Sequence, residues 1–184
     1  MIEVVVYDPG IFDASFAGRF RFAAAGFYLG VIRIRGNTVV DTQLIRVLHH
    51  ELVHAALDAA APSYVAPAWL NEGFAEWFEV RTLGKRGLDP WEWNALRQAY
   101  REGALLPVGT LSRRSFAGLG PRAARVAYLQ SYAMVDHLSR SHGEGSLREF
   151  CLSVVRGQDL SRSLRRVYRM DLATLERRFI DELS

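Results

Sequence analysis

The run His-Glu-Leu-Val-His at residues 50–54 is the part of the sequence best suited to chemistry. In a helix, two histidines four residues apart lie on one face, one turn apart. The imidazoles of His50 and His54 can therefore bind a single metal ion at about 2.0–2.1 Å. Glu51 projects beside that face, near enough to accept a proton from a water molecule that the metal activates. This spacing predicts a metal-dependent hydrolytic site.

A catalytic zinc ion takes three protein ligands and leaves its fourth position for water, so a third ligand must come from another part of the chain. One alternative is a histidine at position 60, but the chain has Ala60 there, and His137 and His142 lie in no ligand pattern. The other alternative is Glu72, which follows His54 after seventeen intervening residues. This separation allows the first helix to end, a loop to turn back and a second helix to cross the first.

Two neutral imidazoles and one carboxylate suit zinc and leave the ion a net positive charge, which makes it a Lewis acid. We therefore expect one Zn²⁺ ion, with Glu51 as the general base on the attacking water. Glu76, one helical turn after Glu72, is expected to accept a hydrogen bond from the second ring nitrogen of His50. Gly73 has no side chain and allows a neighbouring backbone to approach closely beside the metal.

Length and composition place further bounds on the protein. The 184 residues suit one domain, and 49% apolar with 23% charged residues is an ordinary globular balance. Cys151 is the only cysteine, which excludes an internal disulfide framework and a cysteine zinc cluster. The C-terminal arginines favour a solvated helical face over an anionic partner, so nucleic acid is not expected. With no signal-peptide pattern and no run near about 18 apolar residues, the sequence predicts a cytoplasmic protein with no membrane partner.

The predicted elements run from strands to helices, and this order predicts an α+β fold. Strands are expected at residues 2–7, 19–28 and 31–35, with turns at Asp8-Pro9-Gly10 and Gly36-Asn37. Helices are expected at 41–60, 69–83, 89–103, 122–141, 145–155, 160–168 and 171–183. We therefore expect a single domain over 1–184. A small N-terminal β-sheet lobe packs on the histidine helix within residues 1–62, and a mostly helical lobe with the glutamate ligand follows at 63–184.

Residues 50–54, followed by Trp-Leu-Asn-Glu-Gly-Phe-Ala-Glu at 69–76, resemble the aminopeptidase N-like branch of the gluzincin zinc metallopeptidases. The similarity is greatest to the small bacterial peptidase MA-like proteins and minigluzincins. It implies a thermolysin-like gluzincin catalytic domain that acts on peptide or protein substrates. In such a domain the two histidines and Glu72 bind the zinc ion, and Glu51 is the catalytic base.

The resemblance extends to Tyr-Leu-Gln-Ser-Tyr at residues 128–132, which is similar to the segment that carries the family's catalytic tyrosine. It implies that Tyr128, or alternatively Tyr132, hydrogen-bonds the oxyanion of the tetrahedral intermediate. The aminopeptidases bind the substrate amine through a glutamate on the strand before the zinc helix, whereas residues 23–28 contain no acid here. An endopeptidase or a peptidase of narrow specificity is therefore favoured over an aminopeptidase. A zinc-binding regulatory or protein-binding module with little turnover is the alternative.

Overall fold

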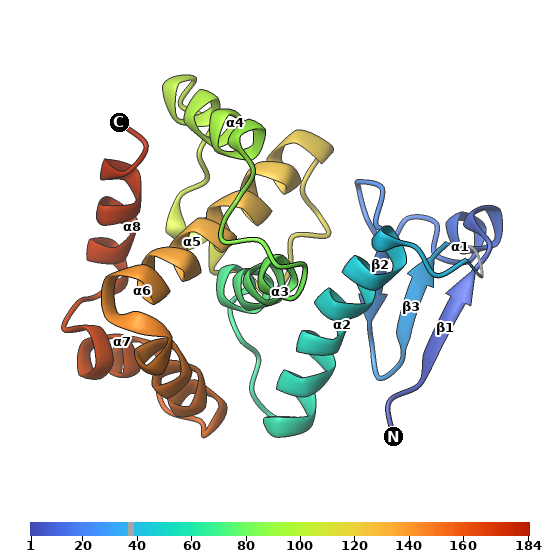
Figure 1. Cartoon of the computed structure of the whole chain (residues 1–184), viewed down its shortest axis with the longest axis horizontal. Coiled ribbons are helices and arrows are strands. Elements are labelled where there is room, and N and C mark those ends of the chain that lie inside the picture. Colours follow the sequence, from blue (N-terminus) through green and yellow to red (C-terminus); the bar gives the residue numbers. More distant parts are fainter. Residues whose placement is uncertain (37–38) are drawn as a thin grey trace.

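The valine-rich run at the N-terminus forms one edge of a small sheet in the computed structural model, which describes residues 1–36 and 39–184. Strand β1 (Val4–Tyr7) pairs in parallel with β3 (Ile32–Arg35), and β2 (Gly26–Tyr28) pairs antiparallel with the other side of β3. The strand order β1-β3-β2 leaves β2 as an edge strand. The predicted α+β class is confirmed, and the described chain is mostly helical (Figure 1).

The segment expected as a turn at Asp8-Pro9-Gly10 begins a helix instead. Helix α1 (Pro9–Ser15) starts with proline at its first position, and the Asp8 side chain accepts hydrogen bonds from the N–H groups of Gly10 and Ile11. An N-cap aspartate followed by proline is a favourable helix start, so the same residues that mark a turn also mark a cap. The turn expected at Gly36-Asn37 includes Asn37, which lies outside the described residues.

The strand expected at residues 19–28 is wrong over most of its length, because only Gly26–Tyr28 pairs with the sheet. The backbone N–H of Arg21 instead donates to the carbonyl oxygen of Ala117, far along the chain. A long-range contact therefore overrides the local strand propensity of this phenylalanine-rich segment.

Helix α2 (Thr42–Ala60) lies between the sheet and the helices that follow it in the chain (Figure 1). The Asp41 side chain caps it by accepting a hydrogen bond from the Leu44 N–H at 2.8 Å. One face of α2 packs on the sheet and another on the following helix, which places its histidines between the two. The small core under the sheet consists of Ile32, Ile34, Val47 and Ala55.

The main core forms where α3 (Ala68–Thr82) crosses α6 (Pro121–Val155), with Trp69 and Tyr132 fully buried between them. The helices expected at 122–141 and 145–155 are joined in α6, with a break at Gly143, whose φ is 82°. No helix in the described part of the chain is long and apolar enough to cross a membrane. The remaining helices are α4 (Pro90–Arg101), α5 (Val108–Leu111), α7 (Leu160–Tyr168) and α8 (Leu172–Asp181).

Candidate metal centre

Helices α2 and α3 bring the two predicted histidines and the predicted glutamate together. The Nε2 atoms of His50 and His54 each lie 3.3 Å from the same atom, Oε2 of Glu72. In a tetrahedral site with bonds of about 2.0–2.1 Å, neighbouring ligand atoms are about 3.3–3.4 Å apart. The separations observed here therefore match the spacing of ligand atoms around a tetrahedrally bound ion.

The side chains of this group are shielded from solvent, with exposed fractions of 12%, 12% and 14% for His50, His54 and Glu72. Burial on its own raises the pKa of the Glu72 carboxyl, but the two neighbouring imidazoles outweigh burial and bring this pKa to about 2. Glu72 is therefore a carboxylate at neutral pH. Two imidazoles and one carboxylate form a donor set that fits a zinc ion with one open position.

Gly73 lies next to Glu72, where α3 crosses α6. A Cβ atom added at Gly73 would lie 2.5 Å from the carbonyl oxygen of Ser131 and 2.6 Å from a methyl group of Val135. Both contacts are shorter than atoms of this kind tolerate, so only glycine lets α6 pass this close to the helix that carries Glu72. The close backbone approach predicted at Gly73 is thus present, and α6 provides it.

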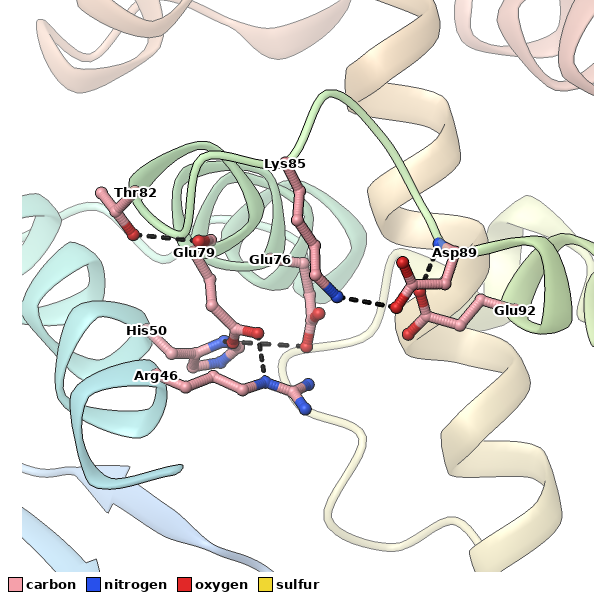
Figure 2. A network of polar contacts seen from close by, with 8 residues as sticks. All are labelled: Arg46, His50, Glu76, Glu79, Thr82, Lys85, Asp89 and Glu92. Carbon is pink, nitrogen blue, oxygen red and sulfur yellow. Dashed lines mark hydrogen bonds and ion pairs between the residues drawn. The ribbon is translucent and has the colours of Figure 1, made fainter. Parts of the chain in front are cut away.

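The second ring nitrogen of His50 faces two carboxylates of α3 (Figure 2). Its Nδ1 atom lies 3.4 Å from Oε2 of Glu79 and 3.7 Å from Oε1 of Glu76. Glu79 is buried and also pairs with the guanidinium group of Arg46, which lies one turn before His50 on α2. Glu76, which the sequence predicted for this place, is therefore near His50, but Glu79 lies closer.

Glu79 was not predicted from the sequence, although helical periodicity marks it. Glu72, Glu76 and Glu79 follow the spacing i, i+4 and i+7, which places all three on one face of a helix. Burial raises the pKa of the Glu76 carboxyl; His50 opposes this rise, and the Glu79 carboxylate adds to it. Carboxylates on one face of α3 thus lie near both ring nitrogens of His50.

Glu51 lies beside the candidate ligands and is only 4% exposed. Its Oε2 atom has no hydrogen-bond partner among the described residues, and a Cβ atom at Gly26 would come 3.4 Å from its Oε1 atom. Burial raises the pKa of the Glu51 carboxyl above its ordinary value, against the lowering effect of His50 and His54. A buried carboxylate with a free oxygen and a raised pKa is suited to accept a proton from water at this site.

Tyr128 is the tyrosine that faces the candidate ligands. Its ring centroid lies 6.4 Å from that of His50, and the rings of Phe22 and Phe116 pack edge-on against it. Burial raises the pKa of Tyr128 well above its ordinary value, and the carboxylates of the site raise it further, so the hydroxyl keeps its proton. The alternative, Tyr132, has a buried hydroxyl and lines neither of the two cavities described below.

The other three histidines of the chain lie apart from this group. His49 packs edge-on against Phe78, as expected for a residue turned away from the metal-binding face. His137 hydrogen-bonds to Glu182, and His142 is exposed. In the described part of the chain, the groups with metal-binding spacing are therefore confined to the acidic face of α3 and the histidines of α2.

Two cavities open along α2: all three candidate ligands line the larger one, and of these only His50 also lines the smaller one. The larger, about 770 Å³, follows the C-terminal half of α2 past His54, and the smaller, about 440 Å³, follows its N-terminal half past Arg46. The edge strand β2 lines the larger cavity, and its first residue also lines the smaller one. The two cavities share part of their lining, and we call this shared lining the waist. The residues that line both cavities, and so form the waist, are Phe20, Gly26, His50, Glu51 and Tyr128.

Comparison with known proteins gives one match. A sequence model of the family described as the Peptidase MA superfamily matches residues 5–183, which include both helices of the candidate site and Tyr128. Neither the comparison with curated proteins nor the comparison with solved structures found a match.

Proposed function

The chain belongs to the Peptidase MA superfamily, and we propose that it is a zinc-dependent peptidase of the gluzincin kind. The observation that carries this proposal is the convergence of His50 and His54 on one oxygen of Glu72, with the buried Glu51 beside them. Peptide hydrolysis at a metal site needs two functions: the ligands hold a Lewis acid, and a separate carboxylate moves the proton.

In this proposal His50, His54 and Glu72 hold the ion. When bound, zinc supplies a Lewis acid that polarises the attacking water and the scissile carbonyl group. Glu51 accepts the proton of the water as general base and later gives it to the leaving amine as general acid. The raised pKa of Glu51 supports both roles, because it brings the carboxyl closer to the pH at which it must take up and release a proton.

Tyr128 stabilises the oxyanion of the tetrahedral intermediate in this proposal. Its ring lies beside His50 at the waist, and its hydroxyl, whose pKa is raised above the ordinary value of 10.0, is protonated at neutral pH. A neutral hydroxyl that is held in place before the reaction can donate a hydrogen bond to the negative charge that develops on the substrate oxygen.

Two features favour cleavage within a peptide chain over removal of its first residue. The cavities on both sides of the waist provide room for substrate residues on both sides of the scissile bond. The edge strand β2 lies along this path, and an extended peptide can pair with such an edge through backbone hydrogen bonds. We therefore propose that the substrate binds as an extended strand next to β2.

Metal content and peptide cleavage together test the function. The parent protein should bind one equivalent of zinc, and His54→Ala and Glu72→Ala should each lose it. Glu51→Gln should keep the zinc and lose cleavage of a peptide library by about 10²–10⁴-fold, which is the usual contribution of a general base.

Two results would contradict the proposal. If the parent takes up no zinc, or if Glu72→Ala binds zinc as well as the parent, the ligand assignment is wrong. If the parent binds zinc through these residues but cleaves no peptide, a zinc-binding module becomes the better description.

A further inference from the structure

The segment between α1 and β2 crosses from the sheet to the helical part of the molecule. We call residues 19–25 the crossing segment. Within it, the backbone N–H of Arg21 donates a hydrogen bond to the carbonyl oxygen of Ala117 at 3.0 Å. Among the described residues, no other backbone hydrogen bond joins residues 1–36 to the chain beyond α2. This single bond therefore ties the sheet to the loop that precedes α6.

Aromatic side chains pack next to this bond. Phe22 of the crossing segment and Phe116, the neighbour of Ala117, each pack edge-on against Tyr128, with ring centroids 6.1 and 5.5 Å away. Tyr128 in turn lies 6.4 Å from His50. The crossing segment, the loop before α6 and the candidate catalytic tyrosine thus form one contiguous group.

These contacts form a closed ring of polypeptide that includes Gly26, His50 and Tyr128 of the waist. The ring runs from Gly26 on β2 back along the chain to Arg21 and across the hydrogen bond to Ala117. It then follows the chain to Tyr128 on α6 and returns to α2 through the contact between Tyr128 and His50. Gly26 completes the ring, because a Cβ atom added there would lie 2.7 Å from a side chain of α2. The ring lies where the two cavities share their lining: Gly26, His50 and Tyr128 belong to the ring and line both cavities, and Phe20 and Glu51, which also line both, adjoin Arg21 and His50 in the chain.

We infer that the two cavities connect through this ring, so that the peptidase takes peptides that enter the waist by a free chain end and excludes the internal loops of folded proteins. This inference rests on the proposed function. A substrate that occupies both cavities passes through the ring. A chain that has a free end can be threaded through it, whereas a closed loop reaches the same position only when the bond between Arg21 and Ala117 is broken. The substrate class is therefore short or unstructured peptides with an accessible terminus.

Linear and cyclic peptides of the same composition test the inference. The zinc-loaded parent is given a pool of short peptides of randomised sequence, and separately the same pool cyclised head to tail. We expect the linear pool to be cleaved at least about tenfold faster. The backbone hydrogen bond and the aromatic side chains packed beside it keep the polypeptide ring closed most of the time. Equal rates for the two pools would overturn the inference.

Two substitutions at one position provide a matched pair. Arg21→Pro removes the N–H donor, whereas Arg21→Ala keeps it and changes only a side chain that lines neither cavity. Cleavage of the cyclic pool should rise by about two- to tenfold in Arg21→Pro. This is the increase in the population of the open ring expected from the loss of one backbone hydrogen bond. Arg21→Ala should match the parent. If both variants treat the cyclic pool alike, the hydrogen bond does not control entry.

Two further measurements do not depend on turnover or on the folding of the proline variant. The amide hydrogen of Arg21 in the parent should exchange at least about tenfold more slowly than that of an unbonded exposed residue, and free exchange would show that the ring is open. Binding of the two pools to zinc-loaded Glu51→Gln separates the possible failures. If the parent cleaves no peptide while zinc-loaded Glu51→Gln binds linear peptides more strongly than cyclic ones, the proposed function is wrong and the closed ring still selects the substrate. If both pools bind equally, or if neither pool binds, the closed ring is not the feature that selects the substrate.

Discussion

The Oε2 atom of Glu79 lies 3.4 Å from Nδ1 of His50, closer than any atom of Glu76 that approaches the same nitrogen. Glu79 is also fixed from its other side, because it pairs with Arg46 of α2. A carboxylate held in this way orients the imidazole and makes its opposite nitrogen a better metal ligand. Glu79 therefore links the two helices that carry the candidate ligands (Figure 2).

The contact between Glu79 and His50 predicts that Glu79→Ala weakens zinc binding by about 10–100-fold, the usual effect of losing a group that supports a metal ligand. Glu76→Ala should have a smaller effect, because the Glu76 carboxylate lies farther from His50 and, among the described residues, forms no ion pair with an arginine as Glu79 does. Competition titration with a zinc chelator measures both affinities. A larger loss in Glu76→Ala than in Glu79→Ala would show that the sequence-based choice of Glu76 was the correct one.

Removal of the Tyr128 hydroxyl should slow catalysis without weakening substrate binding. Tyr128→Phe keeps the ring contacts with Phe22 and Phe116 but loses the proposed donor to the oxyanion, so kcat should fall by about 10²–10³-fold with KM little changed. Tyr132→Phe is the matched control, because its hydroxyl is buried and lines neither cavity. Steady-state kinetics on one cleaved peptide measures both variants. The reverse pattern would move the oxyanion role to Tyr132.

Sequence patterns predicted the parts of the site that depend on one helix at a time. Asp41 caps the histidine helix, and the apolar face of that helix fixes which side packs on the sheet. This local information places the two histidines on one face. The spacing to Glu72 then supports a second helix that returns across the first, and the structure has that arrangement.

Features that depend on contacts between distant segments were not predictable in the same way. The strand expected at residues 19–28 has the right composition, but the bond from Arg21 to Ala117 takes most of it out of the sheet. The importance of Glu79 follows from the way α3 crosses α2, which turns the acidic face of α3 toward His50. Helical periodicity alone shows that Glu79 shares a face with Glu72 but not what that face meets.

The crossing of α3 and α6 gives a stability prediction. Gly73→Ala should lower the free energy of unfolding by about 1–3 kcal/mol, because the added methyl group collides with the Ser131 carbonyl oxygen and with Val135. Zinc affinity should fall as well, since relief of the collision displaces the neighbouring Glu72. Gly145→Ala in α6 is the control: its Cβ atom meets nothing within 4 Å, so it should be neutral or slightly stabilising. Chemical denaturation of the two variants measures the difference, and equal stabilities would contradict the close packing.

Glu182, near the C-terminus, gives a prediction about pH. It accepts hydrogen bonds from His137 and Arg140 of α6. Partial burial raises the pKa of Glu182, but these bonds outweigh it and hold the pKa below the ordinary value of 4.5. Because the folded protein binds this proton less readily than the unfolded chain does, the interaction stabilises the folded state at neutral pH. That stabilisation is lost as the pH falls from about 4.5 through the lower folded pKa.

Glu182→Gln should therefore lower the free energy of unfolding by about 1 kcal/mol near neutral pH, a value reduced for the partial exposure of the carboxylate. The difference between parent and variant should be smaller at about pH 3, because more of the parent carboxyl is protonated there than at neutral pH. Glu149→Gln is the control, because its pair with Arg166 is solvent-exposed and should contribute less than about 0.5 kcal/mol at either pH. Urea denaturation at the two pH values measures the differences. A Glu182→Gln effect that is equal at both would mean that this carboxylate does not anchor the C-terminal turn through its charge.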